Sequence, residues 1–263
     1  FEDDGIEFYE GSHNIISSSR LESNGVWGAV HFEGSSRNTV SNNVFVNNSG
    51  RGIYIYYGES NTIIGNSFQD TGGEPIDIVG SGSKYNVVTG NAFYSASHAV
   101  RLLGSSHNVI SGNTLYNVGP SGSNGSIEIY SADSNLITSN QIYHSNGYAG
   151  INITNSNCEN NYISNNYISG TWSQGEIRDL GANTIYSSQL FNNDLILKPS
   201  GNVGIGTTTP TSTLHIIGSM NVATTSALVG GESILYVDSA DKRVGIGTTE
   251  PDAQFHIDSS DGM

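Results

Sequence analysis

The sequence has few basic residues, one cysteine and no long apolar run, and each shortage excludes a class of protein. Nine lysines and arginines stand against 24 aspartates and glutamates, for a formal net charge of −15. The chain therefore has no basic patch for nucleic acid or an anionic membrane surface. A single cysteine, Cys158, excludes an internal disulfide framework. No apolar segment is long enough to span a bilayer, so membrane insertion is not expected.

Hydrophobic residues, at 35%, and charged residues, at 13%, are both scarcer than in ordinary globular proteins. Glycine, serine, asparagine and threonine replace them. The β-branched and aromatic residues are still too numerous for a disordered chain. This composition favours a thin core repeated many times. The chain begins and ends within a pattern, so we expect it to be a piece of a longer protein.

Asparagine recurs with a period of 22 to 27 residues in the pattern N-x-[VI]-x-x-N-x-[FLI]. A repeat of this length is typical of solenoids. The paired asparagines are Asn38 and Asn43, Asn61 and Asn66, Asn86 and Asn91, Asn108 and Asn113, Asn135 and Asn140, and Asn161 and Asn166. A weaker copy begins at Asn14, and a partial copy begins at Asn183.

Each period also contains a short segment in which two apolar residues flank one polar residue. The copies are IEF at Ile6, VHF at Val30, IYI at Ile53, IDI at Ile76, VRL at Val100, IEI at Ile127 and INI at Ile151. Alternation with a period of two indicates β-strands with one buried face, and glycine, asparagine and serine interrupt any helical pattern.

These features together predict a parallel β-helix, in which each turn adds one strand to each of several parallel sheets. Successive turns would stack about 4.8 Å apart. Identical asparagines would then form ladders, because a side-chain amide both donates and accepts hydrogen bonds. Gly65, Gly90 and Gly112 precede the second asparagine column and would supply a left-handed bend.

Residues 5–186 resemble the right-handed parallel β-helix repeats of the NosD and carbohydrate-binding families. The resemblance implies an all-β solenoid of about eight rungs of roughly 24 residues, which we assign to residues 1–188. Pectate lyases, alginate epimerases and phage tailspikes share this architecture. The resemblance therefore says more about fold than about function.

The polar residue in the middle of each alternating strand would form a column on the outside of one sheet. In related β-helix proteins that bind glycans, the site follows such a sheet. Exposed tyrosines are a second candidate, since they can stack on sugars or on one another. The predicted glycan-binding residues are Tyr54, Asp77, Arg101, Glu128, Asn152, Tyr94, Tyr116 and Tyr143.

Asp77 and Glu128 are the candidate acid–base residues if the chain is an enzyme. They would lie two turns apart, roughly 9.6 Å by the stacking distance, at the upper end for an inverting glycosidase. Arg101 between them would pair with both, which favours a solvated salt-bridge ladder. The motifs of polygalacturonases and epimerases are missing, and the seven histidines are scattered. We therefore expect no catalysis, no metal site and no cofactor.

Residues 189–263 contain the phrase VGIGTT twice, at Val203 and at Val244, each followed by a proline and a strand ending His-Ile. A predicted strand precedes each copy, at residues 195–197 and 234–237. Each unit is too small to bury a core of its own. The phrase resembles repeats of phage tail fibres and related bacterial surface fibres. That resemblance implies a homotrimer held together mainly by residues 190–263.

These observations favour a structural and adhesive fibre protein, outside the cell or on a virion, that contacts a surface polysaccharide through the β-helix. The alternative is a tailspike-like enzyme that degrades or epimerises polysaccharide on the same scaffold.

Overall fold

A computed structural model describes residues 5–25, 27–119, 125–187, 190–191, 203–205, 214–216, 235–238, 242–246, 248 and 250–257. Within these residues every regular element is a β-strand, which confirms the all-β prediction. The chain forms two compact units, Phe1–Gly201 and Asn202–Met263. None of the described residues belongs to a helix that could span a membrane.

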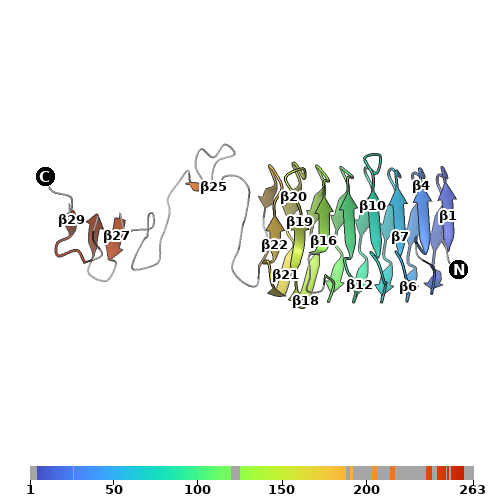
Figure 1. Ribbon diagram of the computed structural model, residues 1–263, viewed down its shortest axis with the longest axis horizontal. Helices are drawn as coiled ribbons and strands as arrows, with labels where there is room; N and C mark the ends of the chain where they lie inside the picture. The colour runs from blue at the N-terminus through green and yellow to red at the C-terminus, as the bar shows by residue number, and fades with distance from the viewer. Residues whose placement is uncertain are drawn as a thin grey trace. The chain divides into compact units, whose positions relative to one another are not determined.

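The first unit is a parallel β-solenoid, as predicted, with three sheets of eight strands each (Figure 1). Sheet 1 contains β1 (Ile6–Tyr9), β4 (Val30–Glu33), β7 (Ile53–Tyr56), β10 (Ile76–Val79), β13 (Val100–Leu103), β16 (Gly125–Tyr130), β19 (Ala149–Ile153) and β22 (Ile177–Asp179). Sheet 2 contains β2 (Ile15–Ser17), β5 (Thr39–Ser41), β8 (Thr62–Ile64), β11 (Val87–Thr89), β14 (Val109–Ser111), β17 (Leu136–Thr138), β20 (Tyr162–Ser164) and β23 (Ile185–Ser187). Sheet 3 contains β3 (Arg20–Glu22), β6 (Val44–Val46), β9 (Ser67–Gln69), β12 (Ala92–Tyr94), β15 (Thr114–Tyr116), β18 (Gln141–Gly147), β21 (Tyr167–Trp172) and β24 (Leu190–Phe191).

The alternating strands form sheet 1, in the register that the repeat predicts. Ile53 pairs with Ile76, and Ile76 with Val100, while Asp77 pairs with Arg101 on the opposite face. The apolar residues of these pairs have no exposed surface and line the core. A slip by one residue would turn every apolar side chain of a strand outward, so burial of one face sets the register.

The core repeats from turn to turn. On sheet 3 the rings of Phe45, Phe68 and Phe93 are stacked, with centroids 4.6 and 5.0 Å apart and nearly parallel planes. Columns of isoleucine and valine on sheets 1 and 2 complete the interior. Cys158 is buried among these apolar residues, as expected of a small hydrophobic side chain.

Two ladders of asparagine amides run along the turns. The Nδ2 of Asn91 donates to Oδ1 of Asn113 at 3.1 Å and to the carbonyl oxygen of Ile63 at 3.0 Å. Its Oδ1 accepts from both the backbone N–H and the Nδ2 of Asn66. The amide thus uses all of its hydrogen-bonding positions. The same bonds join Asn38, Asn61, Asn86, Asn108, Asn135 and Asn161 in the other ladder.

A residue in the left-handed region precedes each ladder asparagine and bends the chain between sheets. Gly90 and Gly112 have φ of 63° and 62° before Asn91 and Asn113, as predicted. Asn42 and Ser139 take the same conformation at other turns, so the bend does not require glycine. A third asparagine contact, between Asn24 and Asn48, was not predicted.

In the second unit each copy of the repeated phrase contains one pair of parallel strands. The strand β25 (Val203–Ile205) pairs in parallel with β26 (Leu214–Ile216), and β28 (Arg243–Ile246) pairs in parallel with β29 (Phe255–Ile257). The strand β27 (Leu235–Asp238) is antiparallel to β28. Gly245 has no room for a side chain, because a Cβ there would lie 2.5 Å from the backbone oxygen of Thr248. The strand expected at residues 195–197 lies outside the described residues.

The ladder predicts a large loss of stability when one rung is broken. Asn91→Leu removes one amide and takes a hydrogen bond from each of Asn66, Asn113 and Ile63. Each stranded buried group costs roughly 1–3 kcal/mol. Urea unfolding measures the loss, and Asn157→Leu, at an exposed turn position, is the control. An Asn91→Leu variant as stable as the control would contradict the ladder.

Candidate functional site

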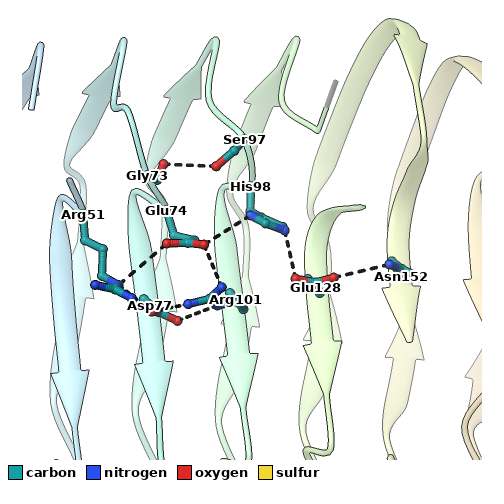
Figure 2. Close-up of polar contacts among 9 residues, drawn as sticks. All are labelled: Arg51, Gly73, Glu74, Asp77, Ser97, His98, Arg101, Glu128 and Asn152. Atoms are coloured by element: carbon teal, nitrogen blue, oxygen red, sulfur yellow. Dashed lines mark hydrogen bonds and ion pairs between the residues drawn. The ribbon is translucent and has the colours of Figure 1, made fainter. Parts of the chain in front are cut away.

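A second column of polar side chains joins the outward column of sheet 1. Arg51, Glu74 and His98 each lie two residues before a strand, at the ends of the connections into β7, β10 and β13. Because successive turns stack, these three side chains lie beside one another and beside the residues of the strands (Figure 2). The corresponding positions before neighbouring strands are glycine or alanine. The change from glycine or alanine to a charged residue or histidine is visible in the sequence, but it lies outside the strands on which the site prediction was based.

Asp77 is at the centre of this charged cluster and has no exposed surface. Its Oδ2 accepts hydrogen bonds from Arg51 Nε at 2.6 Å and Arg101 Nη2 at 2.7 Å, and its Oδ1 accepts one from Arg101 Nε at 3.0 Å. Both carboxylate oxygens are occupied by guanidinium groups. Asp77 therefore holds the two arginines in place, and the structure does not put it in a position to touch a ligand.

Glu74 closes the cluster on the loop side. Its Oε1 lies 2.8 Å from Arg101 Nη1, and its Oε2 lies 3.7 Å from Arg51 Nε. Burial by itself lowers the pKa of Arg101, but the hydrogen bond and charge of Asp77, with the charges of Glu74 and Glu128, raise it above the ordinary value. Arg101 is therefore a permanent cation between carboxylates.

His98 and Glu128 form the next contact along the sheet. His98 Nε2 lies 2.8 Å from Glu128 Oε2, and His98 Nδ1 lies 3.8 Å from Glu74 Oε1. The Oε1 of Glu128 accepts a long hydrogen bond from Asn152 Nδ2 at 3.5 Å. The Glu128 side chain keeps 11% of its surface exposed, whereas that of Asp77 keeps none. His98 is thus within ion-pair distance of Glu128, although neither of its ring nitrogens has hydrogen-bond geometry to a partner among the described residues. A small rotation of the ring would align this pair for proton transfer.

Aromatic rings occupy the N-terminal end of the same face. The ring of Tyr54 lies 4.9 Å from that of His31 and 6.0 Å from that of Tyr56, and the Arg51 guanidinium lies over it at 4.5 Å. Burial, and then the charge of Asp77, raises the pKa of Tyr54 above its ordinary value. The Tyr54 phenol is therefore neutral at neutral pH.

A more open column runs alongside, two residues further along each strand. Its members Tyr56, Val79, Leu103 and Tyr130 are paired in register on β7, β10, β13 and β16. They are partly or well exposed, and Tyr130 is 47% exposed. Sheet 1 therefore offers a charged column beside an apolar and aromatic one.

The predicted site residues divide between two faces. Tyr54, Asp77, Arg101, Glu128 and Asn152 are neighbours on sheet 1, as expected. They form no solvated ladder, because the side chains from the preceding connections cover much of them. The other predicted residues, Tyr94, Tyr116 and Tyr143, are in register on sheet 3. The structure thus separates the two predicted groups of residues instead of joining them in one site.

The fold and this face define a parallel β-helix protein with an ionic and aromatic surface along one sheet. The family model of the periplasmic copper-binding protein NosD matches residues 1–122 and 50–220. The chain belongs to the NosD family. No curated protein matches the chain. The family match does not bear on the resemblance of residues 189–263 to tail fibres, which stays a prediction.

Two of the solved structures that match this chain are modules of carbohydrate enzymes. The A-module of the mannuronan C-5 epimerase AlgE4 from Azotobacter vinelandii matches with a TM-score of 0.51 and 16% identity, over 68% of this chain and 55% of that chain. The catalytic domain of a GH87 α-1,3-glucanase in complex with nigerose matches with a TM-score of 0.41 and 15% identity, over 75% of this chain and 50% of that chain. The chain spans about half the length of these structures.

The epimerase match corrects the expectation that the chain is not an enzyme. That expectation rested on missing motifs and on Arg101 between Asp77 and Glu128. The fold that this chain shares at TM-score 0.51 is that of an enzyme module. Arg101 also has its three nitrogens on Asp77 and Glu74, so Glu128 keeps His98 as its direct partner.

The family's description raises the question of copper, which proteins bind through cysteine, methionine and histidine. Within the described residues no group of three or more histidine, cysteine, aspartate and glutamate side chains could hold a metal ion. Glu74 beside His98 is paired with Arg101, whose charge opposes a cation, and Cys158 lies in the core. The described residues do not fit a copper site.

The cluster predicts that Asp77 is a structural residue. Asp77→Ala would remove the fully buried carboxylate that the partly buried Arg51 and Arg101 share, and breaking a buried ion pair costs about 3–5 kcal/mol. We expect a loss of this size in urea unfolding. Glu33→Ala, a half-exposed carboxylate on β4, is the control and should change stability by less than about 0.5 kcal/mol. Equal stability of the two variants would show that the ion pairs contribute little.

Proposed function

We propose that this chain is a carbohydrate-active β-helix protein that binds a polysaccharide along the outward face of sheet 1 and acts on it through Glu128 and His98. The observation that carries the proposal is the 2.8 Å contact between His98 and the partly accessible Glu128, beside an open aromatic column. The shared fold with a mannuronan epimerase supports it.

The arrangement suits a long, regular ligand. The charged and aromatic columns repeat at the spacing of the turns, about 4.8 Å, so a polymer lying across the strands would meet similar groups at each turn. Tyr56 and Tyr130 provide apolar ring faces with a polar tip. Glu128 provides a hydrogen-bond partner for hydroxyl groups, and the buried Asn152 holds the Glu128 carboxylate from the next turn.

The reaction would be acid–base chemistry on the polymer. Glu128 keeps 11% of its side-chain surface exposed and is not paired with an arginine, and His98 beside it can supply or accept the proton that Glu128 exchanges with the sugar. Such general acid–base catalysis contributes about 10²–10⁴-fold to a rate. Asp77 takes no part in the proton transfer, because both of its oxygens are held by arginines.

Turnover tests this assignment. Incubation with a panel of neutral and acidic polysaccharides, followed by assays for new reducing ends and for the absorbance of unsaturated products, should show one active substrate. Glu128→Gln should lower its turnover by about 10²–10⁴-fold, with the melting temperature little changed. Glu159→Gln, an exposed carboxylate on a turn, should retain the parent rate. Turnover by Glu128→Gln at the parent rate, or no turnover of any polymer, would refute the catalytic proposal.

The tyrosines of sheet 3 are a second proposed surface for sugars. Tyr94 is 43% and Tyr116 is 53% exposed, and they pair directly across the strands. Two variants distinguish the two faces: Tyr116→Ala on sheet 3 and Tyr130→Ala on sheet 1, each measured for its affinity for the polysaccharide that the parent binds. If sheet 1 is the principal site, Tyr130→Ala weakens binding more.

We also propose that the protein works outside the cytoplasm, in keeping with the periplasmic description of its family. Surface attachment and assembly into a fibre are part of this proposal. The repeated phrase supports it, because Phe255 and Ile257 in the second copy are 60% and 58% exposed in a single chain. Apolar side chains in a unit this small need a partner surface.

Light scattering checks the assembly. The whole chain should have the mass of a homotrimer at micromolar concentration, and a truncation to residues 1–188 should be monomeric, because the proposed contacts lie in residues 190–263. Phe255→Asp in the whole chain should weaken the trimer by placing a charge in the contact. A monomeric mass for the whole chain would contradict the proposal, and a trimer of residues 1–188 would move the contact to the β-helix.

A further inference from the structure

We infer that the polysaccharide bound by sheet 1 is neutral and rich in hydroxyl groups, and not a polymer of uronic acids or sulfated sugars. The inference rests on the proposed function, since it names the ligand class of the same face. It comes from how the charges of this face are already paired and from what remains exposed beside them.

The arginines at the centre of the face are occupied by the protein's own carboxylates. The Nε and Nη2 of Arg101 donate hydrogen bonds to Asp77, and its Nη1 forms an ion pair with Glu74. Arg51 places Nε on Asp77 and lies over the ring of Tyr54. A sugar carboxylate would have to compete with Asp77 and Glu74 for the positive charge of Arg101, because three of the five N–H groups of this guanidinium already point at these carboxylates.

The charge of the face also opposes an anionic polymer. Its two outward columns and the column before the strands contain five carboxylates and three guanidinium groups in the described residues. The carboxylates are Glu7, Glu33, Glu74, Asp77 and Glu128, and the guanidinium groups are Arg51, Arg101 and Arg178. The whole chain carries −15, so its field repels polyanions at low salt.

Arg178 does not change this result. It lies on β22, three strands from Arg101 on β13 and thus on the order of 14 Å away. Its Nη1 donates to Asn152 Oδ1 at 3.0 Å. One guanidinium at the end of the face cannot match a polymer with a negative charge on every sugar.

The exposed column beside the ion pairs suits neutral sugars. Tyr56, Val79, Leu103 and Tyr130 are uncharged and offer flat or apolar surfaces to the C–H faces of sugar rings.

A neutral ligand also limits the chemistry. Elimination or epimerisation at C5 needs a carboxyl group on that carbon to make its proton acidic, and a neutral hexose has none. The reaction at Glu128 and His98 would therefore be hydrolysis. The bond between the anomeric carbon and the leaving oxygen breaks as that oxygen takes a proton from Glu128, the water oxygen bonds to the anomeric carbon, and the proton that the water loses returns to the Glu128–His98 pair.

Affinity measurements on the whole chain test the ligand class. The probes are soluble β-glucan, dextran and mannan as neutral polymers, and alginate and polygalacturonate as acidic polymers, each at 50 and 500 mM NaCl. At least one neutral polymer should bind ten times more tightly than either acidic polymer, with little dependence on salt. An acidic polymer that binds more tightly than every neutral one, and weakens in high salt, would overturn the inference. No binding of any polymer would instead refute the proposed function, and this inference with it.

Two variants test the physical reasons. Tyr130→Ala should weaken binding of the neutral polymer roughly 2- to 10-fold, whereas Tyr162→Ala, an exposed tyrosine on sheet 2, should have no effect. Equal losses of affinity in the two tyrosine variants would place the ligand elsewhere.

Glu74→Gln removes one carboxylate from Arg101 and should increase alginate binding. If a folded Glu74→Gln variant binds alginate no better than the parent, pairing of the arginines does not exclude acidic polymers. If this variant does not fold, the comparison of polymers on the parent chain decides.

Discussion

Stacking of each turn on the next, at about 4.8 Å, is the constraint on which the rest of this structure depends. It places equivalent residues of successive turns directly beside one another, so each side chain must be compatible with its own counterpart. Asparagine meets this condition at the bends because one amide both accepts from the turn before it and donates to the turn after it. Phenylalanine meets it in the core because its rings stack.

The same constraint builds the charged cluster. Arg51 and Asp77 are 26 residues apart, and Asp77 and Arg101 are 24 apart, yet both pairs are in hydrogen-bond contact. Like charges in one column would repel at this spacing, and here the signs alternate from turn to turn. Cations and anions therefore neutralise one another within the protein. This internal pairing leaves Glu128 with His98 and leaves the neighbouring column of tyrosine, valine and leucine open.

Family membership and fold say less about the function of this chain than the side chains on sheet 1 do. Membership in the NosD family and the match to an epimerase module both describe a scaffold, and scaffolds of this kind have many functions. The described side chains do not fit copper. The sheet 1 face, with an acid–base pair beside an aromatic column, is what directs the proposal toward a polysaccharide.

The sequence by itself determined the period, the strands and the ladders, because these follow from local alternation and from residues that repeat in register. Ile53, Ile76 and Val100 could be assigned to the core, and Asn91 and Asn113 to a ladder, without coordinates. The tertiary structure alone decided how accessible the outward column is and which partners it has. Arg51, Glu74 and His98 lie at the ends of connections of varying length, whose paths no repeat specifies. Those paths cover Asp77 and bring His98 to Glu128, since burial depends on contacts between turns and not on the alternation within a strand.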